Sequence, residues 1–275
     1  MDNRKNDQDV PPEAMAEELV ADMDLAGVAV AGILGRVLPP RQDEAFVRAG
    51  NDCTIAAVRA YPERLFGLCY VNPALDPSWV GDELDRCLSQ PEMRGIKQEI
   101  DVNARDPRME TVMAKASQYG CPILFHSWSL NKWRFTEAQK AQQAESSRPE
   151  DIADLARRFP EVTFQMAHLE GAGPSGIDAV AALPNVFIDT SGGLPFTGTV
   201  EYAVERIGAD RIVFGSDWSG RGYPTQLGRI YGAALAPEER DKILFHNARE
   251  FWRLGSEFAS QCAAAQEQPL PFPAT

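Results

Sequence analysis

The chain has 275 residues, the usual size of one α/β barrel, and its 44% hydrophobic content suffices for a sizeable buried core. Its net charge of −13 argues against binding to nucleic acid or to an anionic membrane, because both need clustered Lys and Arg. Five cysteines without a CxxC pair indicate neither a disulfide framework nor a zinc knuckle. Residues 1–10 are polar and lack an apolar signal segment, so we expect a cytoplasmic protein.

Short apolar runs alternate with amphipathic stretches along the chain. Seven runs are typical of strands buried on both faces of a parallel sheet: Val28–Leu34, Leu65–Val71, Arg94–Ile100, Pro122–His126, Val162–His168, Val186–Thr190 and Arg211–Asp217. Helices are predicted at Pro12–Met23, Glu44–Ala60, Ser78–Leu88, Glu110–Tyr119, Arg148–Phe159, Ile177–Leu183, Thr199–Ile207 and Pro237–Leu254. This βα alternation predicts an α/β fold with right-handed crossovers, either a closed barrel or an open doubly wound sheet.

The pattern begins with a helix, whereas an eight-stranded barrel should begin with a strand. Residues 2–10 include one apolar residue and cannot supply that strand. We therefore expect one barrel domain over residues 1–255, with 1–10 as a polar tail and the first strand missing. Residues 256–275, rich in Ala and then in Pro, are expected to form a tail that is poorly ordered or lies along the surface, with a docking strap as the alternative.

Three polar residues end predicted strands: His126, His168 and Asp217. The carboxyl ends of all barrel strands share one face, so these side chains should converge. Two imidazoles and a carboxylate are good ligands for zinc or a similar divalent metal. Each residue alone can also be read as structural, Asp217 as a turn former, but the set at equivalent positions favours a shared site. The third histidine, His246, lies in the last helical stretch and is interpreted as structural.

Several segments together resemble the amidohydrolase-related family, which includes decarboxylases of the aminocarboxymuconate-semialdehyde type and lactone or amide hydrolases. They cover roughly residues 12 to 254 in the family's order: Met23–Val28, Gly67–Pro73, Arg94–Lys97, Pro122–His126, Arg158–Gly171, Asn185–Gly192, Gly208–Trp218 and His246–Trp252. The resemblance implies a (β/α)8 TIM-type barrel of the metal-dependent hydrolase type that lacks strand 1. Homo-oligomers are also plausible from the family.

The resemblance implies a role for each of the three residues. His126 matches a metal ligand, and His168 matches a histidine that binds a second metal or contacts the substrate and the nucleophilic water. Asp217 matches a metal ligand that also acts as general acid or base. The implied cofactor is a divalent metal, zinc first with manganese or iron as alternatives, which can lower the pKa of a bound water to about 7.

The chain departs from the family pattern in two places. The His-x-His of the first strand is absent. Where the family often has Lys-Leu-His, this chain has Lys97, Gln98 and Glu99. Alternation places Lys97 and Glu99 on one face. Glu99 can replace a ligand or pair with Lys97, and a polar pocket wall is favoured over a ligand. Three explanations stay open: a natural chain that begins further upstream, altered chemistry with fewer ligands, or a non-catalytic barrel that binds a ligand or partner.

The loop after Pro122–His126 is long and contains Trp128, Trp133 and Arg134. Together with Trp218, these residues are candidates for a substrate pocket that suits a small aromatic or unsaturated carboxylate, or they simply pack the loop. The resemblance favours metal-assisted hydrolysis of a C–N or C–O bond in a small molecule. Non-oxidative decarboxylation of such a carboxylate is the alternative, because both reactions would use the same residues.

Overall fold

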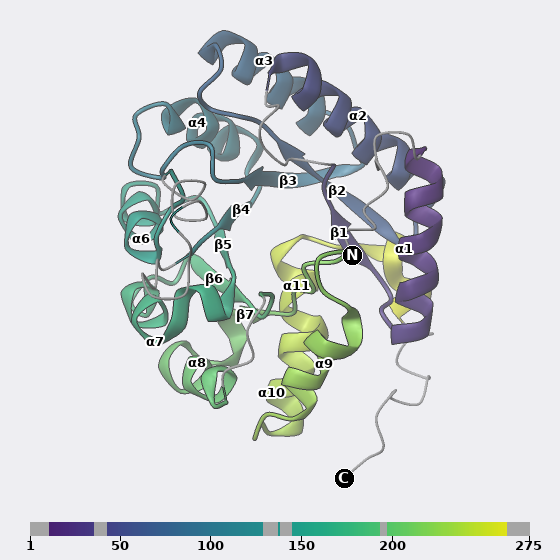
Figure 1. Cartoon of the computed structure of the whole chain (residues 1–275), viewed down its shortest axis with the longest axis vertical. Coiled ribbons are helices and arrows are strands. Elements are labelled where there is room, and N and C mark those ends of the chain that lie inside the picture. Colours follow the sequence, from purple (N-terminus) through teal and green to yellow (C-terminus); the bar gives the residue numbers. More distant parts are fainter. Residues whose placement is uncertain (1–10, 36–42, 129–136, 138–144, 193–196, 263–275) are drawn as a thin grey trace.

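The computed structural model describes residues 11–35, 43–128, 137, 145–192 and 197–262. Seven parallel strands form one curled sheet with helices on its outside (Figure 1). The strands are β1 (Ala31–Ile33), β2 (Leu65–Tyr70), β3 (Met93–Gln98), β4 (Ile123–His126), β5 (Phe164–Ala167), β6 (Val186–Asp189) and β7 (Ile212–Val213). They pair in chain order, and each overlaps a predicted strand. The prediction of a TIM-type barrel that lacks one strand is confirmed.

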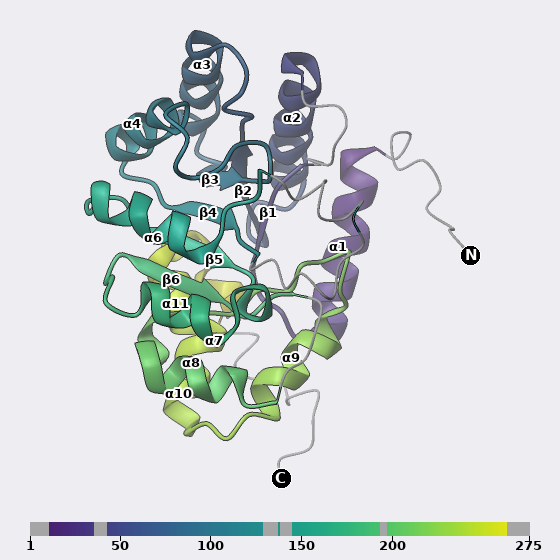
Figure 2. The same cartoon turned by 60° about the vertical axis from the view of Figure 1, so that its left-hand side comes forward.

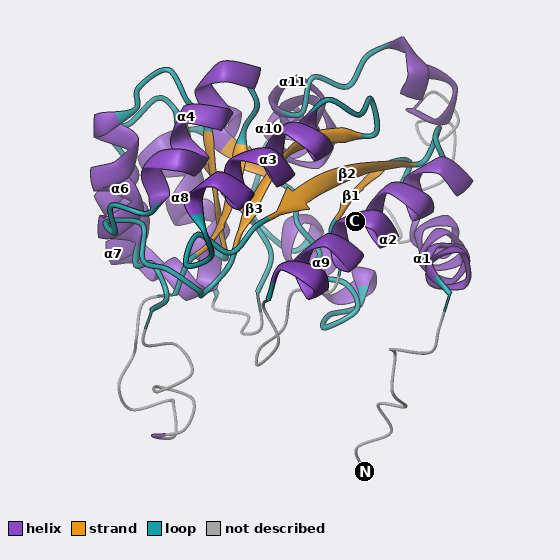
Figure 3. Ribbon diagram, turned by 90° about the horizontal axis from the view of Figure 1, so that it is seen from above, coloured by secondary structure: helices purple, strands orange, loops and turns teal. Residues whose placement is uncertain are grey.

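Helices connect the strands and cover the convex side of the sheet, as Figure 3 shows from above. They are α1 (Pro12–Ala26), α2 (Glu44–Ala60), α3 (Pro77–Leu88), α4 (Met109–Tyr119), α6 (Pro149–Arg158), α7 (Leu169–Val180), α8 (Thr199–Ile207), α9 (Tyr223–Tyr231), α10 (Pro237–Asp241) and α11 (Asn247–Phe251). Short helical turns occur at η2 (Ala209–Arg211), η3 (Lys242–His246) and η4 (Ser256–Phe258). The sequence did not predict α9, and it placed the start of α7 too late.

Local signals explain where several helices begin. The Asp43 carboxylate accepts a hydrogen bond from the backbone N–H of Phe46 and caps α2. Asp76 caps α3 in the same way, followed by Pro77 at the first helical position. Gly27 ends α1 with φ of 69°, a left-handed conformation that an L side chain rarely adopts. These caps fix where α1 ends and where α2 and α3 begin.

The sheet does not close in the described part of the chain, since β1 pairs with β2, β7 pairs with β6, and the two do not pair with each other. Helix α1 lies along this seam and contacts α9 (Figure 2). A seam cluster of buried side chains packs there, consisting of Ala16, Leu19, Val20, Met23, Ala26, Ala57, Val58, Leu65, Tyr223 and Leu227. Packing of side chains therefore takes the place of a ladder of backbone hydrogen bonds.

Two polar contacts fasten α1 to the barrel. The Trp218 indole N–H donates to Asp22 at 2.8 Å, which ties the segment after β7 to α1. Arg64 forms a 2.7 Å ion pair with Asp24 and donates to the carbonyl oxygens of Val28 and Ala29. Arg64 thus satisfies backbone groups just before the edge strand β1, where an unsatisfied edge would be a liability.

The C-terminal part of the described chain, around Phe258, packs against β2 and β3. Phe258 is buried beside Phe66 and Trp252, and Glu257 forms a 2.6 Å ion pair with Arg94. The Asn247 amide donates to two carbonyl oxygens near β7, as expected for a residue that holds this end to the barrel. Residues 263–275 of the predicted tail lie outside the described residues. Nowhere in the described chain does a helix have the length and hydropathy needed to cross a membrane.

The seam cluster should contribute strongly to stability. Met23 is fully buried there, so Met23→Ala leaves a cavity and should lower the free energy of unfolding by about 2–5 kcal/mol. Met15 on the same helix is 40% exposed, and Met15→Ala should change that free energy by only about 0.5 kcal/mol. Urea denaturation measures both. Equal effects of the two substitutions would show that α1 does not hold the seam.

Candidate active site

His126 and His168 meet at the carboxyl ends of β4 and β5. In the sheet, His126 of β4 pairs with Ala167 of β5. His168 directly follows Ala167, and its side chain turns toward that of His126. His126 Nδ1 lies 3.3 Å from His168 Nε2, and the two rings are nearly perpendicular. The structure therefore brings together two of the three residues that the sequence singled out at strand ends.

The other nitrogen of His168 contacts a buried polar chain that sequence reasoning did not identify. His168 Nδ1 lies 2.6 Å from Ser191 Oγ, and Ser191 in turn donates its hydroxyl and backbone N–H to Asp189 Oδ1. Gln165 donates to Asp189 Oδ2 at 2.8 Å. All four side chains are buried. Asp189 ends β6, so the strand-end rule that selected the histidines was the signal that could have found it.

Helix α9 holds the loop that contains Ser191. Gln226 donates to the Gly192 carbonyl oxygen at 3.2 Å. The Arg229 guanidinium donates to the carbonyl oxygens of Thr190 and Gly192 at 3.1 and 2.9 Å. The loop is therefore fixed by side chains from a helix nearly forty residues further along the chain, which explains why its position could not be read locally.

Lys97 and Glu99 form an ion pair beside the imidazoles, and their role as a pocket wall stays a prediction. Lys97 Nζ lies 3.1 Å from Glu99 Oε1, and Glu99 Oε2 lies 3.8 Å from His126 Nδ1. Lys97 is buried, and a buried ammonium group needs such a partner. The ion pair thus places both a positive and a negative group beside the imidazoles.

Trp128 lies over the two imidazoles. Its ring is stacked on His126 at a centroid distance of 6.3 Å and meets His168 edge-on at 5.8 Å. Trp218 instead directs its indole N–H to Asp22 and packs against the seam cluster. Arg134, the remaining predicted substrate-binding residue, lies outside the described residues, as does Trp133.

Asp217 follows β7 and has φ of 60°, an uncommon backbone conformation for a residue other than glycine. Its side chain is exposed, yet partial burial raises the pKa of the carboxyl to about 6. The positive charges of Arg221 and Lys97 oppose this shift, while Asp189 and Glu99 add to it. Asp217 follows β7 in a parallel sheet, so it belongs to the same end of the barrel as the imidazole pair.

Burial also controls the charge state of the two innermost groups. It lowers the pKa of His168 well below the usual value, and the nearby His126 and Lys97 lower it further. Burial raises the pKa of Asp189, while hydrogen bonds from Ser191 and Gln165 and the charge of Lys97 lower it. His168 is therefore neutral near pH 7, which leaves one ring nitrogen as an acceptor.

His126, His168 and Asp217 remain the predicted metal ligands. Within the described residues, however, no group of three His, Cys, Asp or Glu side chains is placed to hold a metal ion. The facing nitrogens of His126 and His168 are close enough to bond each other instead. The donor types suit zinc or manganese, but their arrangement is not that of a ready metal site.

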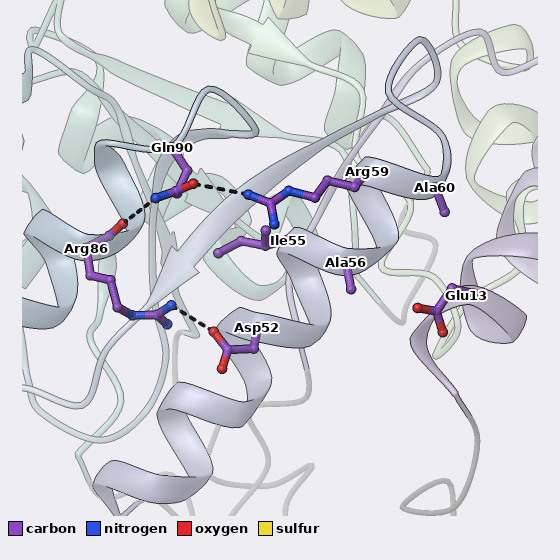
Figure 4. A pocket seen from close by; sticks show the side chains of 8 residues that line it. All are labelled: Glu13, Asp52, Ile55, Ala56, Arg59, Ala60, Arg86 and Gln90. Carbon is purple, nitrogen blue, oxygen red and sulfur yellow. Dashed lines mark hydrogen bonds and ion pairs between the residues drawn. The ribbon is translucent and has the colours of Figure 1, made fainter.

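A depression lies on the outer surface between α1, α2 and α3, away from the strand ends, and has a volume of about 640 Å³ (Figure 4). Its two arginines already have partners: Arg86 forms a 2.8 Å ion pair with Asp52, and Arg59 donates to Gln90. No histidine lines it. Its lining includes the carboxyl groups of Glu13 and Asp52 but no imidazole and no aromatic side chain, in contrast to the strand ends.

The profile of the amidohydrolase family matches residues 2–254, so the chain belongs to this family. No curated protein matches the sequence closely enough to count as a relative. The family membership predicted from the ordered segments is thus confirmed.

Solved structures with the same fold include several decarboxylases. The 5-carboxyvanillate decarboxylase of Sphingomonas paucimobilis is 18% identical, with a TM-score of 0.68 over 86% of this chain and 83% of its own. The 2,6-dihydroxybenzoate decarboxylase of Rhizobium is 19% identical, with a TM-score of 0.67 over 86% and 87%. A dihydroxybenzoic acid decarboxylase of a Polaromonas species, with bound manganese and 2-nitroresorcinol, is 18% identical, with a TM-score of 0.69 over 91% of each chain. At these identities the likeness shows a shared fold.

The raised pKa of Asp217 predicts a pH-dependent effect on stability. A carboxyl that is harder to ionise in the folded chain favours folding below pH 4, and this contribution is lost as the pH rises through about 6. Asp217→Asn should therefore raise the urea midpoint at pH 7.5 and leave it nearly unchanged at pH 4. Asp82→Asn on the exposed face of α3 removes the same charge away from the site. If the midpoints of Asp217→Asn and the wild type differed by the same amount at pH 4 and at pH 7.5, the assigned environment would be contradicted.

The arrangement of donors predicts weak binding of a metal by the chain alone. Protein purified without chelators should retain far less than one ion of zinc, manganese or iron per chain, as measured by elemental analysis. A near-stoichiometric ion that is lost in His126→Ala and kept in His246→Ala would show that the strand ends do form a metal site. His246 is exposed on η3 and serves as the matched control.

Proposed function

We propose that this chain removes the carboxylate group of a small, electron-rich aromatic acid as carbon dioxide. The observation that carries the proposal is the meeting, at one end of the barrel, of a flat aromatic wall, a buried ammonium group and a carboxyl with a raised pKa. These are Trp128, Lys97 and Asp217. An aromatic carboxylate needs a stacking surface, a positive charge and a proton donor, which these three groups supply.

Binding would use the wall and the charges. An aromatic ring can stack against Trp128, whose indole is nearly parallel to the His126 ring at a centroid distance of 6.3 Å. The substrate carboxylate is attracted by Lys97, whose charge also influences both Asp217 and Asp189. Glu99, paired with Lys97 at 3.1 Å, balances that charge when the substrate is absent.

The chemical step is a proton transfer followed by cleavage of a C–C bond. Protonated Asp217 gives its proton to the ring carbon that bears the carboxylate. The bond to the carboxylate carbon then breaks, its electron pair restores the aromatic ring, and carbon dioxide leaves. Asp217 is left ionised and regains a proton from solvent. A pKa near 6 suits this role, because a general acid works best when its pKa lies close to the working pH.

The activities of the structural relatives favour decarboxylation over hydrolysis for this chain. The three described above are decarboxylases of hydroxylated or methoxylated aromatic acids, and at least one of them was solved with manganese. The proposed step uses no metal, because the described residues do not place three ligands around one ion. For a divalent metal, either zinc or manganese, we propose His126, His168 and Asp217 as the ligands.

The proposal is tested by measuring carbon dioxide released from hydroxybenzoates and from 5-carboxyvanillate, with added manganese and after chelation. We expect release that falls by about 100-fold or more in Asp217→Asn, the usual loss for a general acid. His246→Gln, which alters an exposed imidazole away from the site, should retain the wild-type rate.

Two outcomes would overturn this function. Acid release from esters or amides without carbon dioxide would favour the hydrolase that the sequence first suggested. Tight binding of aromatic acids without turnover, unchanged in Asp217→Asn, would favour a non-catalytic barrel.

A further inference from the structure

One hydroxyl group lies between two groups that can both accept a proton. Ser191 Oγ is within hydrogen-bond distance of both His168 Nδ1 and Asp189 Oδ1. A serine hydroxyl has a single hydrogen, so it can donate to only one of them. The group that does not receive this hydrogen must itself be the donor. The direction of the Ser191 hydrogen therefore decides which nitrogen of His168 is protonated.

The surroundings of Asp189 settle that direction. The backbone N–H of Ser191 donates to Asp189 Oδ1 at 3.0 Å, and the Gln165 amide donates to Oδ2 at 2.8 Å. Oδ1 thus accepts from a backbone N–H, which can only donate, and Oδ2 accepts from the NH2 of the Gln165 amide. The opposite orientation of the Gln165 amide would place its oxygen against the carboxylate, which is repulsive. Burial disfavours the charge of Asp189, but these two donors and the nearby charge of Lys97 favour it. The ionised carboxylate so stabilised draws the Ser191 hydrogen, and Ser191 then accepts from His168.

We propose that Ser191 and Asp189 are positioning residues that hold His168 in the tautomer protonated on Nδ1. His168 Nε2 is then a bare acceptor that faces His126 Nδ1 at 3.3 Å. Hydrogen-bond donation runs in one direction, from His126 through His168 and Ser191 to Asp189. A bound molecule that takes the place of His126 at Nε2 must offer a proton there, as water or a phenolic hydroxyl does.

This inference deepens the proposed function, because a phenolic hydroxyl is the group that an electron-rich aromatic acid brings to the site. The tautomer of His168 is a property of the protein without substrate, so it can be tested without any turnover. The hydrogen bonds of Ser191 and Asp189 join them to His168, to Gln165 and to each other. Their role is thus to orient His168 rather than to contact the reacting atoms.

The tautomer can be measured directly by nitrogen-15 NMR on histidine-labelled protein near pH 7, with chelator present. The chain has three histidines, so His126→Gln and His246→Gln assign the signals. The wild-type spectrum should show His168 protonated on Nδ1 alone. A His168 protonated on Nε2, or one that exchanges rapidly between the two forms, would overturn the proposal whether or not the chain is an enzyme.

Variants separate orientation from general packing. Ser191→Ala should abolish the single tautomer, and Ser191→Thr, which keeps the hydroxyl, should restore it. Thr190→Val removes the neighbouring buried hydroxyl, which accepts from the Gly215 N–H and not from His168, and should leave the tautomer unchanged. A tautomer unaffected by Ser191→Ala would show that Ser191 has no orienting role, and the wild-type measurement remains decisive if that variant fails to fold.

A kinetic readout applies once carbon dioxide release is observed. Ser191→Ala should then lower kcat by roughly 10- to 100-fold, as the loss of an outer hydrogen-bond partner commonly does. KM should change little, because Ser191 is buried behind His168. A loss confined to KM would contradict an orienting role. Absence of any turnover would count against the proposed function alone and leave the NMR result standing.

Discussion

The packing of α1 across the open seam is the constraint on which the rest of the structure depends. No backbone hydrogen bonds join the described strands β1 and β7 across the seam, so side chains must hold the two edges of the curled sheet in place. The seam cluster joins α1 to α2, β2 and α9, and Trp218 ties the segment after β7 to Asp22. Because the segment that contains Asp217 is adjacent to this contact, the seam also helps to hold one side of the candidate site.

Curvature matters because it turns strand ends toward one another. In a parallel sheet with neighbouring strands in register, His126, His168 and Asp189 all leave the sheet at the same end. The lateral spacing of strands then allows hydrogen bonds from β4 to the loop after β6. The resulting chain from His126 to Asp189 is buried, which makes each contact strong and each missing partner costly.

Charge in this site is balanced locally rather than exposed to solvent. Lys97 is neutralised by Glu99, and Asp189 is stabilised by donors from Ser191 and Gln165. Burial raises the pKa of Asp217 to about 6, and the charges of Asp189 and Glu99 add to this shift. Two carboxyl groups at the same end of one barrel thus differ in role: one orients an imidazole, and the other is suited to proton transfer.

The sequence by itself determined the order of the elements, the seven strands, the absence of the first strand and the convergence of His126 and His168. These features depend on local periodicity and on the rule that parallel strands end at one face, so they can be read from short segments. The pairing of Lys97 with Glu99 was foreseen as one of two possibilities, because alternation within a strand fixes which side chains share a face.

Only the tertiary structure decided the remaining contacts of the site. The partner of His168 is Ser191, 23 residues away, and the partner of the Trp218 indole is Asp22, 196 residues away. Helix α9, which fixes the Ser191 loop, begins at Tyr223 and Pro224 without a capping side chain, so its start carries little local signal. Which side chains meet across neighbouring strands and across the seam depends on how the whole sheet curves, and no short stretch of sequence contains that information.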